Sequence, residues 1–399
     1  MGKYKQAWIY LICATILCSC GKDDPTTEAI PRLSIADVAQ AEGNTNKIFE
    51  FVVSLSNTYS KPVSVKYSTI AGTAKSGADF IAVTDQVLTI EANQSSGKIL
   101  ITVIGDDIRE GNDEFLVRLT SPVNATISRE SATGTIQNDD LKVGFSNNGY
   151  DAPDSYPGYE LVWSDEFNGS ALDAGSWVFD AGDGCPGLCG WGNNELQYYT
   201  NSPDNLFFQD GKLIIEARKE SYGGKNYTSS RIKTAGKKAW TFGRIDIRAK
   251  LPEGRGIWPA FWMLPQESPL GQWPTSGEID IMELIGSEPK RSHGTVHFGP
   301  GPGSTQISRS FSLDEGKFSE QFHVFSLEWK ENEIQWLIDG NLFSTVRKSD
   351  LGTSQYPFNE PFYLLINLAV GGNWPGAPDA DTYFPQHLIV DYVRIYQQD

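Results

Sequence analysis

The sequence predicts an all-β protein made of two consecutive domains. Apolar and polar residues alternate in short runs, as at residues 49–53, 63–67 and 98–103, and a period of two is typical of half-buried strands. Turns rich in Gly, Asn, Asp and Ser separate these runs, and neither an amphipathic helix nor a solenoid repeat is evident. The length of 399 residues favours two or three domains over one.

The first twenty residues resemble an export signal. Lys3 and Lys5 precede an apolar run over residues 7–17 that is short for a membrane span. The run closes in Leu17-Cys18-Ser19-Cys20, which resembles a bacterial lipoprotein signal with Cys20 as the lipidated cysteine. We therefore expect a signal peptide over residues 1–20, a tether over 21–30, and a lipid-anchored, surface-exposed position on the outer membrane. An ordinary cleaved signal is the alternative, and either one exports the protein.

Charge and cysteine usage narrow the choice of ligands. A net charge of −17 disfavours nucleic acid and favours a neutral ligand or a cation such as calcium. Cys185 and Cys189 lie four residues apart in a Gly- and Pro-rich loop. In an oxidising compartment they are expected to form a disulfide, since no histidine accompanies them as a metal ligand.

Residues 31–140 are predicted to form a sandwich of about seven strands. The segment contains no Trp, so an aromatic sugar platform is not expected there. Its turns resemble those of a Calx-beta domain; the matching segments are AEG (41–43), GTA (72–74), GADF (77–80), GDD (105–107), EGNDEF (110–115) and NDD (138–140).

The Calx-beta resemblance implies a calcium site at one tip of the sandwich. Its ligands would be Glu42, Asp79, Asp107, Asp139 and Asp140, since calcium takes six to eight oxygen ligands. The alternative is an acidic tip without an ion, in a domain that serves as a spacer.

Residues 141–158 have the composition of a linker, and residues 159–399 form a second domain that is again rich in strand patterns. A large, curved sandwich of two sheets is the architecture that we expect, with a concave face free to line a groove.

The most informative stretch of the second domain is an acidic strand at residues 277–286. Glu278 and Asp280 point to one face, and simple alternation would send Glu283 to the other. One extra residue near Met282, a β-bulge, would bring Glu283 back beside the first two acids and leave Leu284 on the apolar face. The strand is therefore predicted to be bulged and to carry three carboxylates on one face.

Three interpretations of this acidic face are open. It is a solvated strand face, a calcium site, or a pair of catalytic carboxyls, and like charges held this close resist ionising together. The nearby Trp258, Trp262 and Trp273 favour sugar chemistry, because flat aromatic rings stack on sugars and two carboxyls flank the bond that a glycosidase cleaves.

Residues 159–398 resemble a glycoside hydrolase of family sixteen, most like a bacterial laminarinase. The matching segments, in the order of the family, are WSDEF (163–167), GWGNNELQYY (190–199), YTSSRI (227–232), WPAFWMLP (258–265), the acidic strand and GGNWPG (371–376). The resemblance implies a β-jelly roll with a concave, sugar-binding sheet. It also implies that Glu278 is the nucleophile and Glu283 the general acid/base, with Asp280 between them, in a retaining mechanism.

The same resemblance nominates residues that bind the sugar. Trp262 and Trp273 would stack on glucose units, with Trp258 as a less secure third. Asn194 and Arg231 would hydrogen-bond sugar hydroxyls on the glycone side, and His297 would lie near the acids, unless it is a strand residue without a role. Trp163, Trp329 and Trp336 are assigned to the core.

Relatives in this family also carry a structural calcium ion, for which Glu166 and Asp391 are the matching positions. Hydrolysis itself requires no cofactor. The expected function is that of a monomeric endo-β-1,3-glucanase acting on β-glucan. The alternatives are action on mixed-linkage β-1,3-1,4-glucan or on an algal galactan such as agar, and a surface protein that binds glycan without cutting it.

Overall fold

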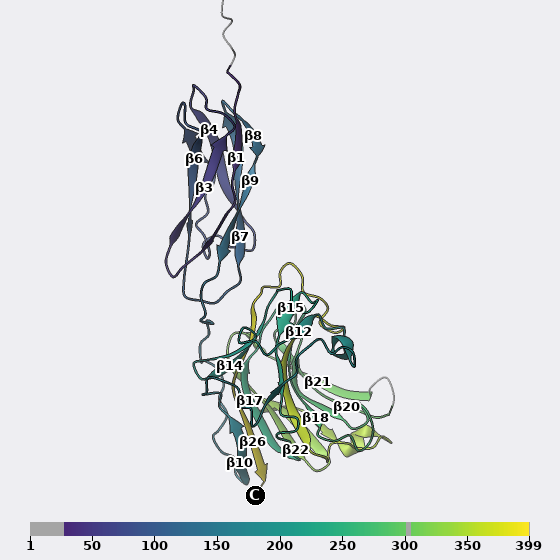
Figure 1. Ribbon diagram of the computed structural model, residues 1–399. Helices are drawn as coiled ribbons and strands as arrows, with labels where there is room; N and C mark the ends of the chain where they lie inside the picture. The colour runs from purple at the N-terminus through teal and green to yellow at the C-terminus, as the bar shows by residue number, and fades with distance from the viewer. Residues whose placement is uncertain (1–27, 301–304, 399) are drawn as a thin grey trace, which may run out of the picture. The chain divides into compact units, whose positions relative to one another are not determined.

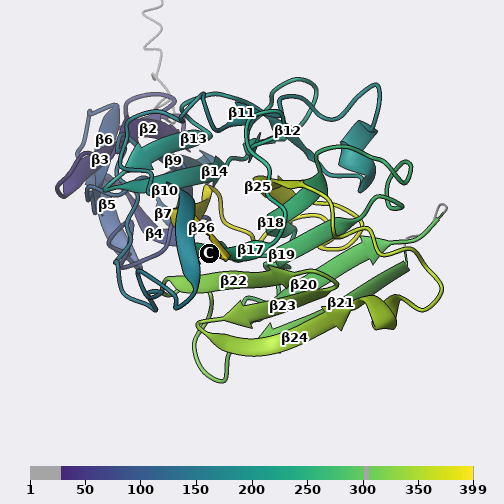
Figure 2. The same ribbon diagram turned by 90° about the horizontal axis from the view of Figure 1, so that it is seen from below.

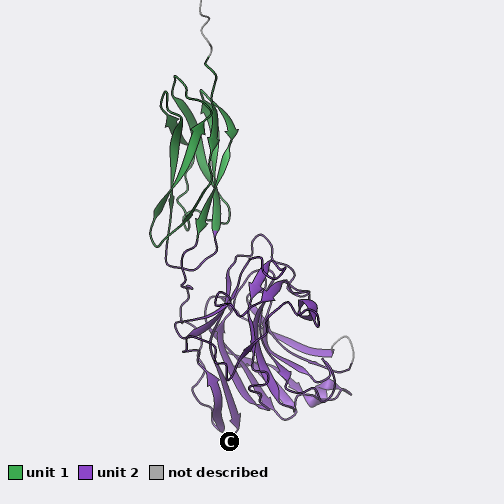
Figure 3. Ribbon diagram, in the orientation of Figure 1, with its two compact units in different colours: residues 1–105, 113–137 green, residues 106–112, 138–399 purple. Residues whose placement is uncertain are grey.

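The computed structural model describes residues 28–300 and 305–398. Its contacts divide the chain into two compact units, shown in Figure 3: unit 1 is Met1–Gly105 with Asp113–Gln137, and unit 2 is Asp106–Asn112 with Asn138–Asp399. In the described part, the helical segments are two short 3-10 turns, η1 (Cys189–Gly192) and η2 (Lys348–Leu351). None of its helices is long and apolar enough to span a membrane. The all-β prediction is confirmed, and the signal sequence lies outside the described residues.

Unit 1 is a sandwich of a four-stranded sheet, in the order β6-β3-β1-β8, and a five-stranded sheet, in the order β2-β9-β7-β4-β5 (Figure 1). The strands are β1 (Arg32–Ile35), β2 (Val38–Ala41), β3 (Lys47–Leu55), β4 (Val63–Ala71), β5 (Gln86–Ile90), β6 (Ser96–Val103), β7 (Asp113–Val123), β8 (Thr126–Arg129) and β9 (Ser131–Gln137). More strands form than the sequence predicted, because β1, β2 and β8 have four residues each and are too short for a recognisable alternation. In β3, Phe49, Phe51 and Val53 are buried while the residues between them are exposed, which confirms the period of two.

Unit 2 is a larger sandwich of two curved sheets (Figure 1, Figure 2). One sheet runs β13-β14-β26-β17-β22-β23-β24, with β10 beside β26; the other runs β11-β16-β25-β18-β19-β20-β21, and β12 pairs with β15. The first sheet contains β10 (Tyr159–Asp165), β13 (Leu206–Gln209), β14 (Lys212–Ala217), β17 (Gly243–Lys250), β22 (His323–Lys330), β23 (Glu333–Ile338), β24 (Asn341–Arg347) and β26 (Gln386–Gln398). The second contains β11 (Val178–Phe179), β16 (Arg231–Lys233), β18 (Ile257–Pro265), β19 (Glu278–Leu284), β20 (Arg291–Phe298), β21 (Thr305–Ser312) and β25 (Phe362–Val370), and the small pair is β12 (Gln197–Tyr199) and β15 (Tyr227–Ser229).

The two sheets of unit 2 pack face to face, with β19 against β22, β21 against β24 and β14 against β25. Trp329 and Trp336 lie in the core between them and are almost fully buried. Trp163 is partly buried and packs against this core beside Trp177 and Trp240. The core assignments of these tryptophans are confirmed.

The segment predicted as a linker, residues 141–158, belongs to unit 2 and packs against the rest of that unit. Val143 is buried in an apolar cluster with Ile214, Phe322 and Ile389. The Tyr156 hydroxyl donates to Asp246 at 2.7 Å. The segment has the composition of a linker, but apolar packing and a side-chain hydrogen bond hold it in place.

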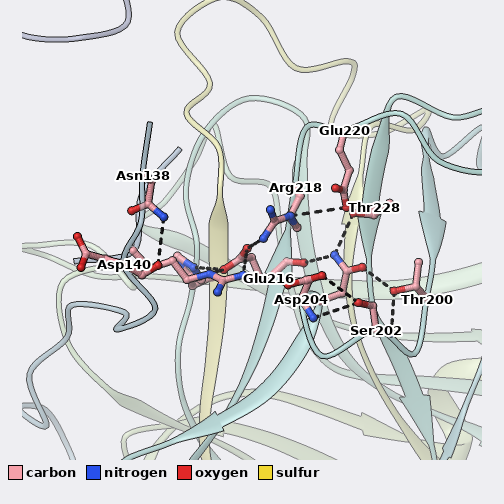
Figure 4. A network of polar contacts seen from close by, with 12 residues as sticks. Asn138, Asp140, Thr200, Ser202, Asp204, Glu216, Arg218, Glu220 and Thr228 are labelled. Atoms are coloured by element: carbon pink, nitrogen blue, oxygen red, sulfur yellow. Dashed lines mark hydrogen bonds and ion pairs between the residues drawn. The ribbon is translucent and has the colours of Figure 1, made fainter. Parts of the chain in front are cut away.

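A buried carboxylate on β14 connects residues 106–112 to the rest of unit 2. Glu216 is 0% exposed and accepts hydrogen bonds from Arg109 (2.7 and 3.0 Å), Arg218 (2.7 Å) and His387 (2.9 Å). Figure 4 shows this group continuing into Asp204, Thr228 and Glu220. Burial alone would raise the pKa of Glu216, but the hydrogen bonds from His387 and Arg109 hold that pKa below its ordinary value.

Arg109→Met is expected to lower the free energy of unfolding of unit 2 by about 3 kcal/mol. Removing one partner of a buried ion pair costs about 3–5 kcal/mol, and Arg218 and His387 remain as hydrogen-bond partners of Glu216. Urea unfolding followed by tryptophan fluorescence measures this, because every tryptophan of the described residues belongs to unit 2.

Lys142→Met is the matched control for Arg109→Met. It removes the exposed ion pair between Lys142 and Asp107, which lies in the same loop as Arg109. This loss should lower the free energy of unfolding by about 0–1 kcal/mol. Equal losses in the two variants would contradict the role assigned to Arg109.

Candidate active site

The bulge predicted in the acidic strand is present. Asp280 of β19 pairs with Thr295 of β20, and Glu283 pairs with His293. Between these two pairs, β19 contains one residue more than β20. Against β18 the shift recurs, since Met282 pairs with Phe261 while Asp280 pairs with Trp262. Ile279 and Leu284 are fully buried. The extra residue thus returns Glu283 to the face of Glu278, as predicted.

A cleft of about 710 Å³ lies over this face of the seven-stranded sheet. Glu278 and Glu283 line it, together with Trp258, Trp262 and Trp273. Asp280 shares this face of β19 but is 3% exposed and does not line the cleft. The cleft therefore presents two carboxyls to a ligand and keeps the third in the floor.

Tryptophan N–H groups orient the two carboxyls that line the cleft. Trp273 Nε1 donates to Glu278 at 2.8 Å, and Trp258 Nε1 donates to Glu283 at 3.1 Å. His297 Nε2 lies 3.2 Å from Asp280 Oδ2 and 3.8 Å from Glu278 Oε1. The prediction that His297 lies near the acids is confirmed, and Trp258 and Trp273 fix the carboxyls as well as offering flat rings.

Burial raises the pKa of all three acids. For Glu278, burial and then repulsion from Asp280 raise the pKa to about 8, while His297 and the Trp273 N–H act in the opposite direction. Burial raises the pKa of Asp280 to about 8. The pKa of Glu283 is raised well above its ordinary value by burial and by repulsion from both Asp280 and Glu278.

This arrangement suits two carboxyls with opposite tasks. Glu283, which feels both other acids, is the group best placed to hold a proton and act as general acid. Glu278 has the N–H of Trp273 to stabilise its ionised form, as a nucleophile requires. Paired acids in different protonation states are the pattern of glycoside hydrolysis.

Arg231 lines the cleft, as the sequence suggested. Its guanidinium lies between the rings of Trp191 and Trp262, with centroids at 4.5 and 4.8 Å. Its Nε is 3.1 Å from Asp180. Stacking and this ion pair fix the guanidinium in the wall of the cleft, and its binding of sugar hydroxyls stays a prediction.

Asn194 does not line the cleft; its neighbour Asn193 does. The Asn194 amide donates instead to Asn373 at 2.8 Å, and the backbone of Asn194 has φ 56°. The structure thus places Asn193, and not Asn194, in the lining of the cleft, and sugar binding by Asn194 stays a prediction.

A buried polar chain supports Trp262 from below. Trp262 Nε1 donates to Asn367 (2.7 Å), Asn367 donates to the Tyr199 hydroxyl (3.2 Å), and that hydroxyl lies 3.4 Å from Glu195. Gln197 donates to Glu195 at 2.6 Å. Glu195, Gln197 and Tyr199 thus belong to the floor and fix a ring of the cleft.

Several residues of the cleft were missed by the sequence analysis. They are Trp191, Tyr363, Trp374, Thr295, Gln306 and Ser308. Trp191 and Trp374 lie in segments that carried the family resemblance, which was the available signal. Thr295, Gln306 and Ser308 have no distinguishing pattern, and only strand pairing places them beside the acids.

The predicted disulfide is present between Cys185 and Cys189. It closes the loop that carries Leu188, which lines the cleft together with Trp191 of η1. The covalent link therefore constrains one wall of the site.

The carboxylates nominated for a structural calcium ion are paired with basic side chains. Glu166 accepts two hydrogen bonds of 2.9 Å from Arg394. Asp391 accepts from Arg248 and lies 2.8 Å from Lys212 Nζ. These ion pairs weigh against a calcium ion at Glu166 and Asp391, and the site stays an untested prediction.

The acids nominated for calcium in the Calx-beta segment are divided between the units. Glu42 and Asp79 belong to unit 1, whereas Asp107, Asp139 and Asp140 belong to unit 2. Asp79 accepts the Lys75 backbone N–H at 2.6 Å, and Asp107 pairs with Lys142. Calcium binding by this set also stays a prediction.

The fold and the paired carboxyls are those of a glycoside hydrolase, and comparison with known proteins identifies the family. The chain belongs to the glycosyl hydrolases family 16, whose profile matches residues 193–390. The profile of the Calx-beta domain matches residues 34–140.

Individual relatives carry the comparison further. A beta-glucanase of Rhodothermus marinus is 45% identical over 265 residues, which are 64% of this chain and 91% of that protein. The glucan endo-1,3-beta-glucosidase A1 of Niallia circulans is 42% identical over 261 residues, 60% of this chain and 38% of that protein. The crystal structure of the laminarinase catalytic domain of Thermotoga maritima aligns with a TM-score of 0.58 at 46% identity, covering 60% of this chain and 99% of that domain.

Asp280→Asn is expected to flatten the dependence of stability on pH. The pKa of Asp280 is about 8 in the folded state, against an ordinary value of 3.8, so the folded protein binds a proton that the unfolded chain releases. The contribution of Asp280 to the free energy of unfolding is therefore fully present below pH 3.8 and is lost as the pH rises toward 8. The wild type should therefore lose more thermal stability than Asp280→Asn between pH 5 and pH 8, measured as Tm.

The exposed Asp314 provides the control, since Asp314→Asn should follow the wild-type curve. When activity is measured against pH, Asp280→Asn should move the basic limb of the profile to lower pH. The reason is that the variant lacks the repulsion from Asp280 that raises the pKa of Glu283. Identical Tm profiles for Asp280→Asn and the wild type would contradict the pKa assigned to Asp280.

Proposed function

We propose that the chain cleaves internal β-1,3 linkages of β-glucan by a retaining double displacement. The observation that carries the proposal is the bulge in β19, which places Glu278 and Glu283 on one face of a cleft lined by tryptophans. The names of the relatives, a beta-glucanase and a glucan endo-1,3-beta-glucosidase, support the substrate class.

The mechanism follows from the contacts of the two glutamates. Glu278 attacks the anomeric carbon while Glu283 gives its proton to the leaving oxygen, which forms a glycosyl–enzyme ester. Glu283, now ionised, takes a proton from water, and that water attacks the same carbon and releases Glu278. The net configuration is retained. The buried Asp280 repels both glutamates and raises the pKa of each.

The experiment that tests the substrate is product analysis on laminarin, lichenan, barley mixed-linkage glucan and agarose. We expect a ladder of short glucose oligomers from laminarin, and proton NMR of the first products should show the β-anomer. Cleavage of agarose without cleavage of laminarin would keep the two glutamates but overturn the substrate. No cleavage of any polysaccharide would favour the glycan-binding alternative.

Glu283→Gln is expected to lower kcat on laminarin by about 10²- to 10⁴-fold, the usual contribution of a general acid. An aryl β-glycoside of laminaribiose with a dinitrophenolate leaving group should recover most of the first step, because that leaving group departs without a proton. Glu278→Gln is the control and should fail on both substrates. Full hydrolysis of laminarin by Glu283→Gln would refute the assignment.

We also propose that the chain acts as a lipid-anchored monomer on the outer membrane. The support is sequence alone: Lys3, Lys5, the apolar run over residues 7–17, and Cys20. Partition of the full chain into a detergent phase, lost in Cys20→Ser, would support the anchor.

A further inference from the structure

Glu195 is a buried carboxyl that the proposed mechanism does not use. It is 7% exposed and does not line the cleft. Its Oε2 accepts hydrogen bonds from Gln197 Nε2 at 2.6 Å and from the Tyr199 hydroxyl at 3.4 Å, and the Asn193 side chain donates to the same carboxyl. A buried polar group is costly unless hydrogen bonds replace its water. Three donors that converge on one buried acid therefore indicate that this part of the unit is built around it.

The hydrogen bonds that connect Trp262 to Glu195 can run in one direction only. An indole N–H donates and cannot accept, so the atom of Asn367 that faces Trp262 is the amide oxygen. The amide nitrogen of Asn367 then faces the Tyr199 hydroxyl, which accepts from it and directs its own proton to Glu195. Because every group in this series passes a donor to the next one, the series has to end on an acceptor. Glu195 is that acceptor.

A second hydrogen-bond series reaches the same carboxyl. The backbone N–H of Val370 donates to Gln197 Oε1 at 2.8 Å, so the amide nitrogen of Gln197 is the atom that faces Glu195. Burial raises the pKa of Glu195, whereas the hydrogen bond from Gln197 and the positive charge of Arg231 act in the opposite direction. Both series require an acceptor at position 195, and the partners of this carboxyl favour its ionised form.

Three residues that line the cleft depend on this buried carboxyl. Trp262 lies at the far end of the first series, and Asn193 donates to the carboxyl directly. Arg231 interacts with the charge of the carboxyl, and its register partner on β25 is Asn367. The Arg231 guanidinium also lies over the ring of Trp262, 4.8 Å from the centroid. Glu195 thus acts on Trp262 through hydrogen bonds and through its neighbour in the wall.

We infer that Glu195 is a positioning residue of the active site, whose buried carboxylate fixes the orientation of Trp262 and Asn193 before the sugar binds. The inference rests on the proposed function. Side chains that are already held in one orientation lose little conformational freedom when a ligand arrives, and affinity gains from this. Glu195 bonds to neither Glu278 nor Glu283 among the contacts of the described residues. Its loss should therefore weaken binding of the substrate and leave the chemical step nearly unchanged.

Tyr199→Phe tests the inference with the smallest change, because it removes only the oxygen that joins Asn367 to Glu195. Its matched control is Tyr356→Phe. Tyr356 is also buried, and its hydroxyl has no hydrogen-bond partner within the part of the chain that the structure describes. The values of kcat and KM are measured on laminarihexaose, and urea unfolding of each variant shows that it is folded under the assay conditions.

Tyr199→Phe should raise KM about three- to tenfold, the effect of one neutral hydrogen bond, and change kcat by less than about twofold. Glu195→Gln should also raise KM with little change in kcat, because the amide brings a further donor to a place where three donors already converge. Tyr356→Phe should match the wild type in both constants.

A double-mutant cycle with Trp262→Phe separates positioning from a general effect on folding. Phenylalanine keeps a ring on β18 but has no N–H to donate to Asn367. Tyr199→Phe should therefore lower kcat/KM about three- to tenfold in the wild type and by less than about twofold in Trp262→Phe, since the two changes interrupt the same series. A change that acted only by loosening the fold would have the same effect in both backgrounds.

Four results would overturn the inference. Equal effects of Tyr199→Phe and Tyr356→Phe would show that the hydroxyl of Tyr199 has no special role. An undiminished effect of Tyr199→Phe in the Trp262→Phe background would disconnect the series from that ring. A wild-type KM in Glu195→Gln would show that the carboxylate is not needed. Intact laminarihexaose with the wild type would refute the proposed substrate itself, which is seen before any variant is compared, and the inference would fall with it.

Discussion

The extra residue in β19 is the constraint on which the rest of the active site depends. With a strict period of two, Glu283 would face the core that contains Ile279 and Leu284. The bulge is held from the opposite sheet, because Trp336 Nε1 of β23 donates to the Asp280 backbone oxygen at 2.8 Å. This bond satisfies a carbonyl where the pairing with β20 is interrupted. Gly294 of β20 makes room for the indole, since a Cβ there would lie 2.4 Å from Trp336 Cδ1.

Burial of the acids is the second constraint, and it follows from the first. Once three carboxyls share one face, their repulsion and the loss of water favour protonated forms. The indole N–H groups of Trp273 and Trp258 each satisfy one carboxyl without adding charge. A lysine at either place would lower the pKa of both glutamates, and the general acid would lose its proton. Neutral donors orient the acids and leave their high pKa values intact.

Much of this site could be predicted from the sequence because it follows from local periodicity. The acids at 278, 280 and 283 require a bulge if all three serve one cleft, and the buried positions of Trp329 and Trp336 follow the strand pattern. Loop geometry could not be predicted in this way. Trp191 and Asn194 have φ values of 52° and 56°, and such backbone turns direct side chains without any periodic signal.

The pairing of strands that lie far apart in the sequence could not be predicted from residue spacing either. Glu166 meets Arg394 and Asp391 meets Arg248 only because β10 and β17 both pair with β26. A resemblance can align an acidic position with a metal ligand, but it does not show the basic side chain that lies opposite it. An acid paired with arginine is already compensated, so a divalent cation would have to displace that partner.

The ion pair between Arg109 and Glu216 bears on where the catalytic unit begins. The Calx-beta profile spans residues 34–140, whereas the contacts place residues 106–112 in unit 2. Glu216 is fully buried on β14, next to β26, and a carboxylate there without enough cations would be costly. Arg109 binds Glu216 through two nitrogens of its planar guanidinium, a geometry that matches a carboxylate. A chain that begins at residue 159 would lack Arg109 and keep only Arg218 and His387 beside Glu216.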